Sequence, residues 1–147
     1  MTKADFRAMR ETAGYSQQAL ADALNVNVKT VKRWEHEADA SQPPADAWNL
    51  LEAALDVQRR MAAYAVSAVR EQEAALGAKP QAVQLTYFRD QAMFDRYGRD
   101  EGYFGVANAN ARAAAAALQA EDHGVSFSYP CENDSSIEAA RSATESD

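Results

Sequence analysis

Three short helical segments, joined by two links of only three residues, constrain this sequence more than any other feature. The segments cover residues 2–13, 17–24 and 28–38. In each of them, apolar or alanine side chains recur at intervals of three and four residues, which is typical of a helix with one buried face. Gly14 is suited to end the first segment, and Ser16 and Asn27 are good N-caps for the next two. The sequence therefore predicts a small helical domain at its N-terminus.

The rest of the chain combines long helical stretches with two short strands. Residues 45–76 contain no helix-breaking residue, and Gly77 and Pro80 follow them. The patterns also predict strands at 82–88 and 125–129, and helices at 89–97 and 106–121, the last ended by Gly124. We therefore expect a mainly α fold: an N-terminal domain of four to five helices, then a small α+β region. The two strands could pair with each other or with those of a second chain.

Composition restricts the kind of core and the kinds of site that the chain can form. The 33 alanines favour helix but bury little area each, which predicts a thin core and a second subunit. The single cysteine, Cys131, excludes an internal disulfide and a four-thiolate zinc site. No apolar run is long enough for a signal peptide or a membrane span, so we expect a cytoplasmic protein.

The formal charge of −7 is unevenly distributed. Residues 1–120 carry a net charge of −1, whereas residues 121–147 carry −6. The acidity thus belongs to the end of the chain, where we predict a disordered acidic tail over 131–147. Binding to nucleic acid depends on local positive charge, so the acidic total does not exclude it.

Basic side chains gather on one side of the third segment. If Val31 and Trp34 face inward, the outward side holds Lys29, Thr30, Lys32 and Arg33, with Val28 at its tip. Lysine and arginine can pair with guanine, and a valine or threonine methyl can contact the methyl group of thymine. Taken alone, three basic residues on a helix would more often be a solvated face.

The surrounding residues favour the DNA-binding interpretation. The informative segments are 13–21, 24–27 and 30–35. On these residues the chain resembles, over roughly residues 3–56, the lambdoid repressor/Cro-type (XRE) family of helix-turn-helix transcriptional regulators. Asn25 stands where the family usually has glycine, and it tolerates the left-handed backbone needed there. The stretch 36–39 also departs from the family pattern, which more often has Asn-Gly or a basic loop.

The resemblance implies that the third helix enters the major groove of DNA. By this resemblance Val28, Lys29 and Arg33 would contact base edges. Phosphate or mixed contacts are expected from Gln17, Asn27, Thr30 and Lys32. Gln17 begins the second helix, where backbone N–H groups favour a phosphate. The resemblance also implies a structural ion pair between Arg10 and Glu35.

The C-terminal half exceeds what such a domain needs, and we assign it to homodimerisation. Residues 1–56 would be the DNA-binding domain, 57–130 the dimerisation domain and 131–147 the tail. Segment 85–90 and the aromatic, glycine-containing loop 97–105 loosely resemble small phage and bacterial regulators, including anti-CRISPR-associated autorepressors.

These observations predict a non-enzymatic protein without a metal or cofactor. His36 and His123 stand far apart and lack the spacing of metal ligands. We expect a homodimeric, sequence-specific repressor that binds a palindromic operator and regulates its own promoter. One alternative is an antitoxin that binds a toxin and also autoregulates its operon. Another is an interaction module that has lost DNA binding, which the acidic residues Glu35, Glu37 and Asp39 would favour.

Overall fold

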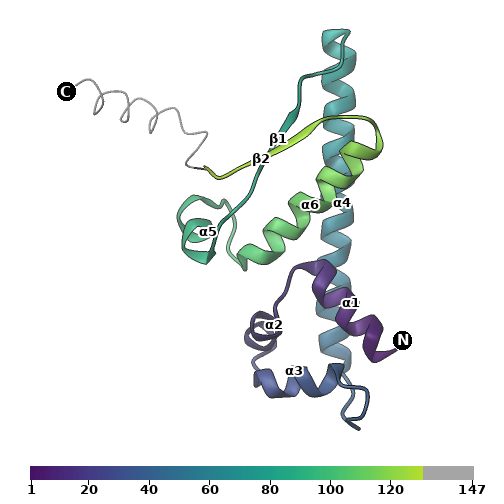
Figure 1. Ribbon diagram of the computed structural model, residues 1–147, viewed down its shortest axis with the longest axis vertical. Coiled ribbons are helices and arrows are strands. Elements are labelled where there is room, and N and C mark those ends of the chain that lie inside the picture. Colours follow the sequence, from purple (N-terminus) through teal and green to yellow (C-terminus); the bar gives the residue numbers. More distant parts are fainter. Residues whose placement is uncertain (131–147) are drawn as a thin grey trace, which may run out of the picture.

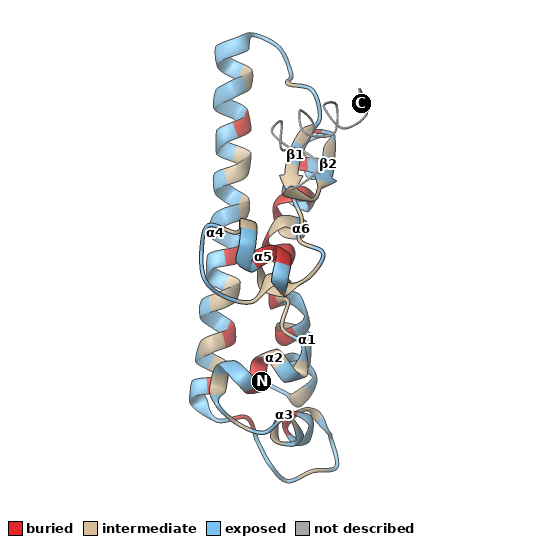
Figure 2. Cartoon of the chain, turned by 90° about the vertical axis from the view of Figure 1, so that its left-hand side faces the viewer, coloured by how far each residue is buried: buried red, intermediate tan, exposed pale blue. Residues whose placement is uncertain are grey.

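The long helix α4 (Ala45–Leu76) runs the length of the molecule, and Figure 2 shows most of the chain on one side of it. The computed structural model describes residues 1–130. In chain order the elements are α1 (Lys3–Ala13), α2 (Gln17–Leu24), α3 (Val28–Glu35), α4, β1 (Val83–Thr86), α5 (Gln91–Tyr97), α6 (Phe104–Ala120) and β2 (Val125–Ser128) (Figure 1). The fold is therefore mainly helical with two short strands, as the sequence predicted.

The residues that the sequence indicated as caps, Gly14, Ser16 and Asn27, do mark the end of α1 and the starts of α2 and α3. Thr2 and Asp5 form a capping box at the start of α1, in which each side chain accepts a hydrogen bond from the other residue's backbone N–H. Gly14 ends α1 in the left-handed region, with a φ of 97°. Asn25 ends α2 in the same region, with a φ of 55°, which confirms that asparagine serves this turn in place of glycine.

Helix α4 has the bounds that the sequence predicted and connects the two halves of the molecule. Its first part packs against α1, and its later part packs against α6. The helix continues without a break through the domain boundary expected between residues 56 and 57. That boundary remains a prediction, because a shared helix belongs to both regions.

The two strands pair with each other within the chain, in parallel. Val83 lies opposite Val125, and Thr86 lies opposite Ser128 at the other end of the ladder. The connection between the strands contains α5 and α6, as a parallel pair requires a crossover. Helix α6 packs on both strands and on α4 (Figure 1).

Two helix ends differ from the expectation. The third helix stops at Glu35 rather than at residue 38, because His36 has an extended backbone. The sixth helix stops at Ala120, before the Gly124 that we expected to end it, and Asp122 adopts the left-handed conformation (φ 63°). Aspartate takes this conformation more readily than most residues, so the true stop signal lies two residues earlier.

The main apolar core lies among α1, α2, α3 and the start of α4. Its largest fully buried members include Phe6, Leu20, Val31 and Leu51. In the other half of the molecule, much of the buried surface of α6 is alanine or asparagine. Figure 2 shows that α4 is exposed along much of its length, with only a few buried positions.

The predicted acidic tail at 131–147, with Cys131 at its start, lies outside the described residues. Within residues 1–130, no helix combines the length and apolar character needed to cross a membrane.

Candidate nucleic-acid interface

The start of α3 is fixed by a side-chain cap. The Asn27 side-chain oxygen accepts a hydrogen bond from the backbone N–H of Lys29 at 2.9 Å. This bond satisfies one of the N–H groups that a helix leaves free at its N-terminus. The backbone N–H of Val26 donates to the carbonyl of Ala21 at 2.9 Å, which closes the turn after α2. The link between α2 and α3 is thus rigidly defined.

Two buried side chains set the rotation of α3 about its axis. Val31 is fully buried and Trp34 is 6% exposed, as the sequence predicted. The Trp34 ring meets the Phe6 ring edge to face, with centroids 6.0 Å apart. Burial of each such side chain stabilises this orientation by about 1.5–3 kcal/mol. The opposite side of α3 is therefore held toward solvent.

Three basic side chains occupy that outward side. Lys29, Lys32 and Arg33 are all exposed. Their spacing of three and four residues places them on one face of the helix. Within residues 1–130 none of them forms an ion pair with a carboxylate. Their positive charge is thus available to an external anion.

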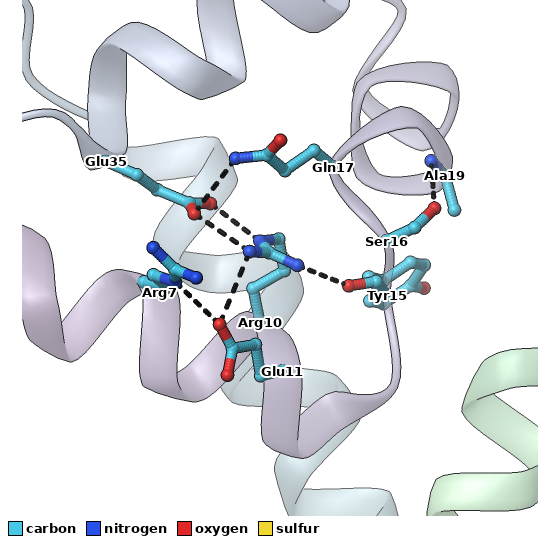
Figure 3. A network of polar contacts seen from close by, with 8 residues as sticks. All are labelled: Arg7, Arg10, Glu11, Tyr15, Ser16, Gln17, Ala19 and Glu35. Carbon is cyan, nitrogen blue, oxygen red and sulfur yellow. Dashed lines mark hydrogen bonds and ion pairs between the residues drawn. The ribbon is translucent and has the colours of Figure 1, made fainter.

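The expected ion pair between Arg10 and Glu35 is confirmed, and it joins α1 to α3 (Figure 3). The guanidinium donates two hydrogen bonds to the carboxylate, at 2.6 and 2.9 Å. A third N–H group of Arg10 donates to the backbone carbonyl of Tyr15 at 2.8 Å. The two charged side chains are only 8% and 4% exposed. The pair therefore fixes the angle between helices and is not offered to a ligand.

Two of the predicted contact residues are partly engaged inside the domain. The Gln17 amide donates to the Glu35 carboxylate at 3.3 Å, as Figure 3 shows. Val28 is half-buried and packs against the apolar core instead of projecting freely from the tip of α3. Thr30 is also half-buried, whereas Asn27 is exposed. The phosphate contact of Gln17 and the base contact of Val28 stay predictions.

Lys3 has a role that the sequence did not indicate. Its ammonium nitrogen lies 2.6–2.9 Å from the backbone carbonyl oxygens of Arg33, His36, Asp39 and Ser41, which share its three N–H donors. A cation is favoured at this end of a helix, where carbonyl groups lack partners. Lys3 thus holds the end of α3 and the following loop in place. It lies 30 residues before Arg33, so no local pattern could have revealed the contact.

The loop after α3 is acidic, and the Asp39 carboxylate in it has hydrogen-bond and charge partners within the domain. The Asp39 carboxylate accepts the backbone N–H of Ser41 at 2.8 Å. This hydrogen bond holds the pKa of Asp39 below its ordinary value, and the nearby charges of Lys3 and Arg33 lower it further. The carboxylate therefore stays ionised in a loop whose carbonyl groups are bound by Lys3.

In the part of the chain that the structure describes, no group of three or more His, Cys, Asp or Glu side chains is placed to hold a metal ion. Residues 6–60 match the model of a protein family described as Helix-turn-helix. The match supports the resemblance of this region to XRE-type regulators, and with it a DNA-binding, transcription-regulatory role. It ends at residue 60, so it gives no support to the resemblance of the C-terminal half to anti-CRISPR-associated autorepressors. No curated protein matches the chain.

Proposed function

We propose that the chain is a sequence-specific transcriptional repressor that binds a palindromic operator as a homodimer and regulates its own promoter. The observation that carries the proposal is the outward face of α3. Lys29, Lys32 and Arg33 are exposed there, on the side opposite the buried Val31 and Trp34. In the helix-turn-helix arrangement this face is the one that enters the major groove.

The chemistry of that face suits both parts of DNA recognition. Lys29 and Arg33 can donate to O6 and N7 of guanine, while Lys32 and Asn27 can contact phosphate oxygens. Thr30 and Val28 are half-buried, so their methyl groups could contact a thymine methyl group only where the base lies close to α3. Each good base contact is worth about 1–3 kcal/mol of discrimination against a wrong base.

Homodimerisation follows from the geometry of operators. A single α3 reads only one half-site, and a two-fold pair reads two half-sites about 34 Å apart. The C-terminal region supports such a role, because its sheet has only two strands within residues 1–130. Helix α6 already supports this small sheet on one face, and a second copy would add to that support. We assign the region from residue 57 to residue 130 to this contact.

Repression would result because the bound protein occupies the promoter. Two α3 helices in successive major grooves would cover a promoter segment and exclude polymerase. The antitoxin alternative requires instead a stoichiometric small protein partner, and no contact within the described residues favours it.

The test is a selection of bound duplexes from a random pool with the full-length protein. We expect a two-fold consensus whose half-site centres lie about 10 base pairs apart. Affinity for the selected duplex should fall steeply with salt, because phosphate contacts release counterions. A pool without enrichment, or a selected duplex whose binding is insensitive to salt, would contradict the proposal.

A further inference from the structure

A large apolar groove lies in the C-terminal half, apart from the outward face of α3 that is proposed to bind DNA. Its volume is about 880 Å³, which is within the range of small-molecule sites. The walls come from α4, β1, α5, α6 and the loop between α5 and α6. Most of the lining is apolar, and it includes the exposed α4 side chains Val57, Met61 and Tyr64.

One polar side chain in this lining lacks adequate partners. Asn110 of α6 is only 8% exposed, and its side-chain oxygen accepts no hydrogen bond within residues 1–130. In the same part of the chain, its NH₂ group donates only to the Met61 sulfur, at 3.4 Å. A thioether is a weak acceptor. A buried amide left in this state destabilises the fold, and a ligand that paired with it would remove that cost.

Met61 is suited to uncover this amide. It is half-exposed, has three rotatable bonds, belongs to α4 and contacts Asn110 where both side chains line the groove. Rotation of Met61 would bring both the donor and the acceptor of Asn110 to the groove surface. A ligand that offers an acceptor beside a donor would then replace the sulfur contact with two ordinary hydrogen bonds.

We propose that this groove binds a flat, mostly apolar small molecule with a cis-amide (lactam) edge, which pairs with the Asn110 side-chain amide. The ring system would lie on the apolar walls, and the lactam N–H and C=O would meet the Asn110 oxygen and nitrogen. The requirement for both a donor and an acceptor separates this class from simple hydrocarbons and from esters of the same shape.

The groove also reaches the helix-turn-helix region. Tyr103 lines it and stacks on Tyr15, with the ring centroids 6.1 Å apart and the planes 10° apart. Tyr15 belongs to the link between α1 and α2, and its carbonyl accepts a hydrogen bond from Arg10. Tyr15 also lines the groove, so a ligand there would contact the link between α1 and α2 directly.

The test uses 2-quinolone and coumarin as probes, which have the same shape but differ in the lactam N–H. Calorimetric titration of the full-length protein should show at least about tenfold tighter binding of 2-quinolone, the equivalent of one hydrogen bond. Asn110→Leu should abolish this preference. Gln119→Leu, an exposed position on the same helix, should retain it.

A second measurement does not depend on the stability of a variant. In NMR spectra of the wild-type protein, the Asn110 side-chain NH₂ signals and the Tyr15 backbone amide should shift with 2-quinolone along the same saturation curve. Equal affinity for the two probes, a preference that survives Asn110→Leu, or unmoved Asn110 signals would overturn the proposal. The proposal would also fail if a second copy of the chain covered the groove. In that case sedimentation would show a dimer, and neither probe would bind at any protein concentration.

Discussion

The two halves of the molecule hold their helices together in different ways. The N-terminal half buries large apolar side chains, such as Phe6 and Leu20, in one continuous cluster. On α6 in the C-terminal half, Leu118 is the one large apolar side chain that is buried, and the other buried side chains are small or polar, among them Ala114, Ala115 and Asn108. Large side chains bury more apolar area per residue, whereas small ones allow helices to approach closely. The first half is therefore stabilised mainly by buried apolar surface, whereas the packing of α6 in the second half depends on close contact between helices and on hydrogen bonds.

Asn108 shows how the C-terminal half replaces apolar area with polar contacts. Its side-chain oxygen accepts the backbone N–H of Phe88 at 2.9 Å, and its nitrogen donates to the Phe88 carbonyl at 2.7 Å. One buried amide thus satisfies both backbone groups of a residue that follows β1. Polar groups of this kind fix one arrangement, because any other arrangement leaves them without partners.

The two halves meet at a pair of glycines. A Cβ atom on Gly14 would lie 2.2 Å from the Gly105 carbonyl oxygen, and one on Gly105 would lie 2.4 Å from the Gly14 oxygen. Nearby, the Gln58 side chain donates to the Thr12 carbonyl at 2.9 Å. The contact between the halves is therefore one of close backbone approach.

The largest effect is expected from emptying the N-terminal core. Phe6→Ala should lower the free energy of unfolding by about 3–5 kcal/mol, because the ring is fully buried and its loss leaves a cavity. Phe127→Ala removes the same ring from β2, where it is 43% exposed, and should cost less than about 1–2 kcal/mol. Urea denaturation measures both. Equal losses would show that the two halves do not differ in the way described.

The next effect comes from the buried ion pair. Glu35→Ala leaves the Arg10 guanidinium buried without its carboxylate, and should cost about 3 kcal/mol. Glu11→Ala removes a carboxylate that is 53% exposed, pairs with Arg7 and lies 3.7 Å from the Arg10 guanidinium; because Arg10 keeps its bonds to Glu35, the loss should be no more than about 1 kcal/mol. Thermal unfolding of both variants at the same pH gives the comparison. A similar shift in Tm for the two would mean that the Arg10–Glu35 pair is not structurally important.

A smaller loss in the free energy of unfolding should follow from disturbing the glycine contact between the two halves. Gly105→Ala places a methyl group against the Gly14 carbonyl and the Tyr103 ring, and overpacking of this kind costs about 1–3 kcal/mol. Gly124→Ala is the matched control, since the nearest atom would be the Ala82 Cβ at 3.5 Å, an ordinary contact. Denaturant unfolding should separate the variants. If Gly105→Ala is as stable as Gly124→Ala, the glycine contact does not join the halves.

The smallest effect on stability is expected from two aspartate side chains that cap helix N-termini, one in each half. Backbone N–H groups of Thr2 and Met93 hold the pKa values of Asp5 and Asp90 below the ordinary value for aspartate. A lowered pKa contributes stability above the unfolded-state pKa of about 3.9, and this stability is lost as the pH falls through the folded-state value.

Asp5→Asn and Asp90→Asn should therefore destabilise the protein at pH 7, and their difference from the wild type should narrow toward pH 3. Unfolding curves at the two pH values provide the measurement. A difference that stays constant between them would exclude the charged caps as a source of stability in either half.

The sequence predicted the N-terminal half well, because local signals determine most of it. Caps such as Ser16 and Asn27 mark helix starts, and the positions of Val31 and Trp34 define which side of α3 is exposed. Local signals cannot predict contacts between residues that are far apart in the sequence. The Lys3 contacts with four carbonyls and the glycine pair depend on how helices meet in space.

The candidate site was partly predictable for the same reason. The exposure of Lys29, Lys32 and Arg33 follows from helix periodicity. The engagement of Gln17 with Glu35 does not, since it requires α2 to approach the end of α3. The parallel pairing of β1 with β2 was open for a similar reason, because alternation indicates a strand but not its neighbour.

The most direct test compares two charge-matched double variants on the duplex selected by the wild-type protein. Lys29→Ala with Arg33→Ala removes two positive charges from the outward face of α3, and Lys79→Ala with Arg99→Ala removes two exposed charges outside the helix-turn-helix region. We expect the first variant to lose at least about 30-fold in affinity, the equivalent of two base contacts, and the second to lose only a few-fold. Circular dichroism should show both variants folded. Equal losses, or full affinity in the first variant, would contradict DNA recognition by this face of α3.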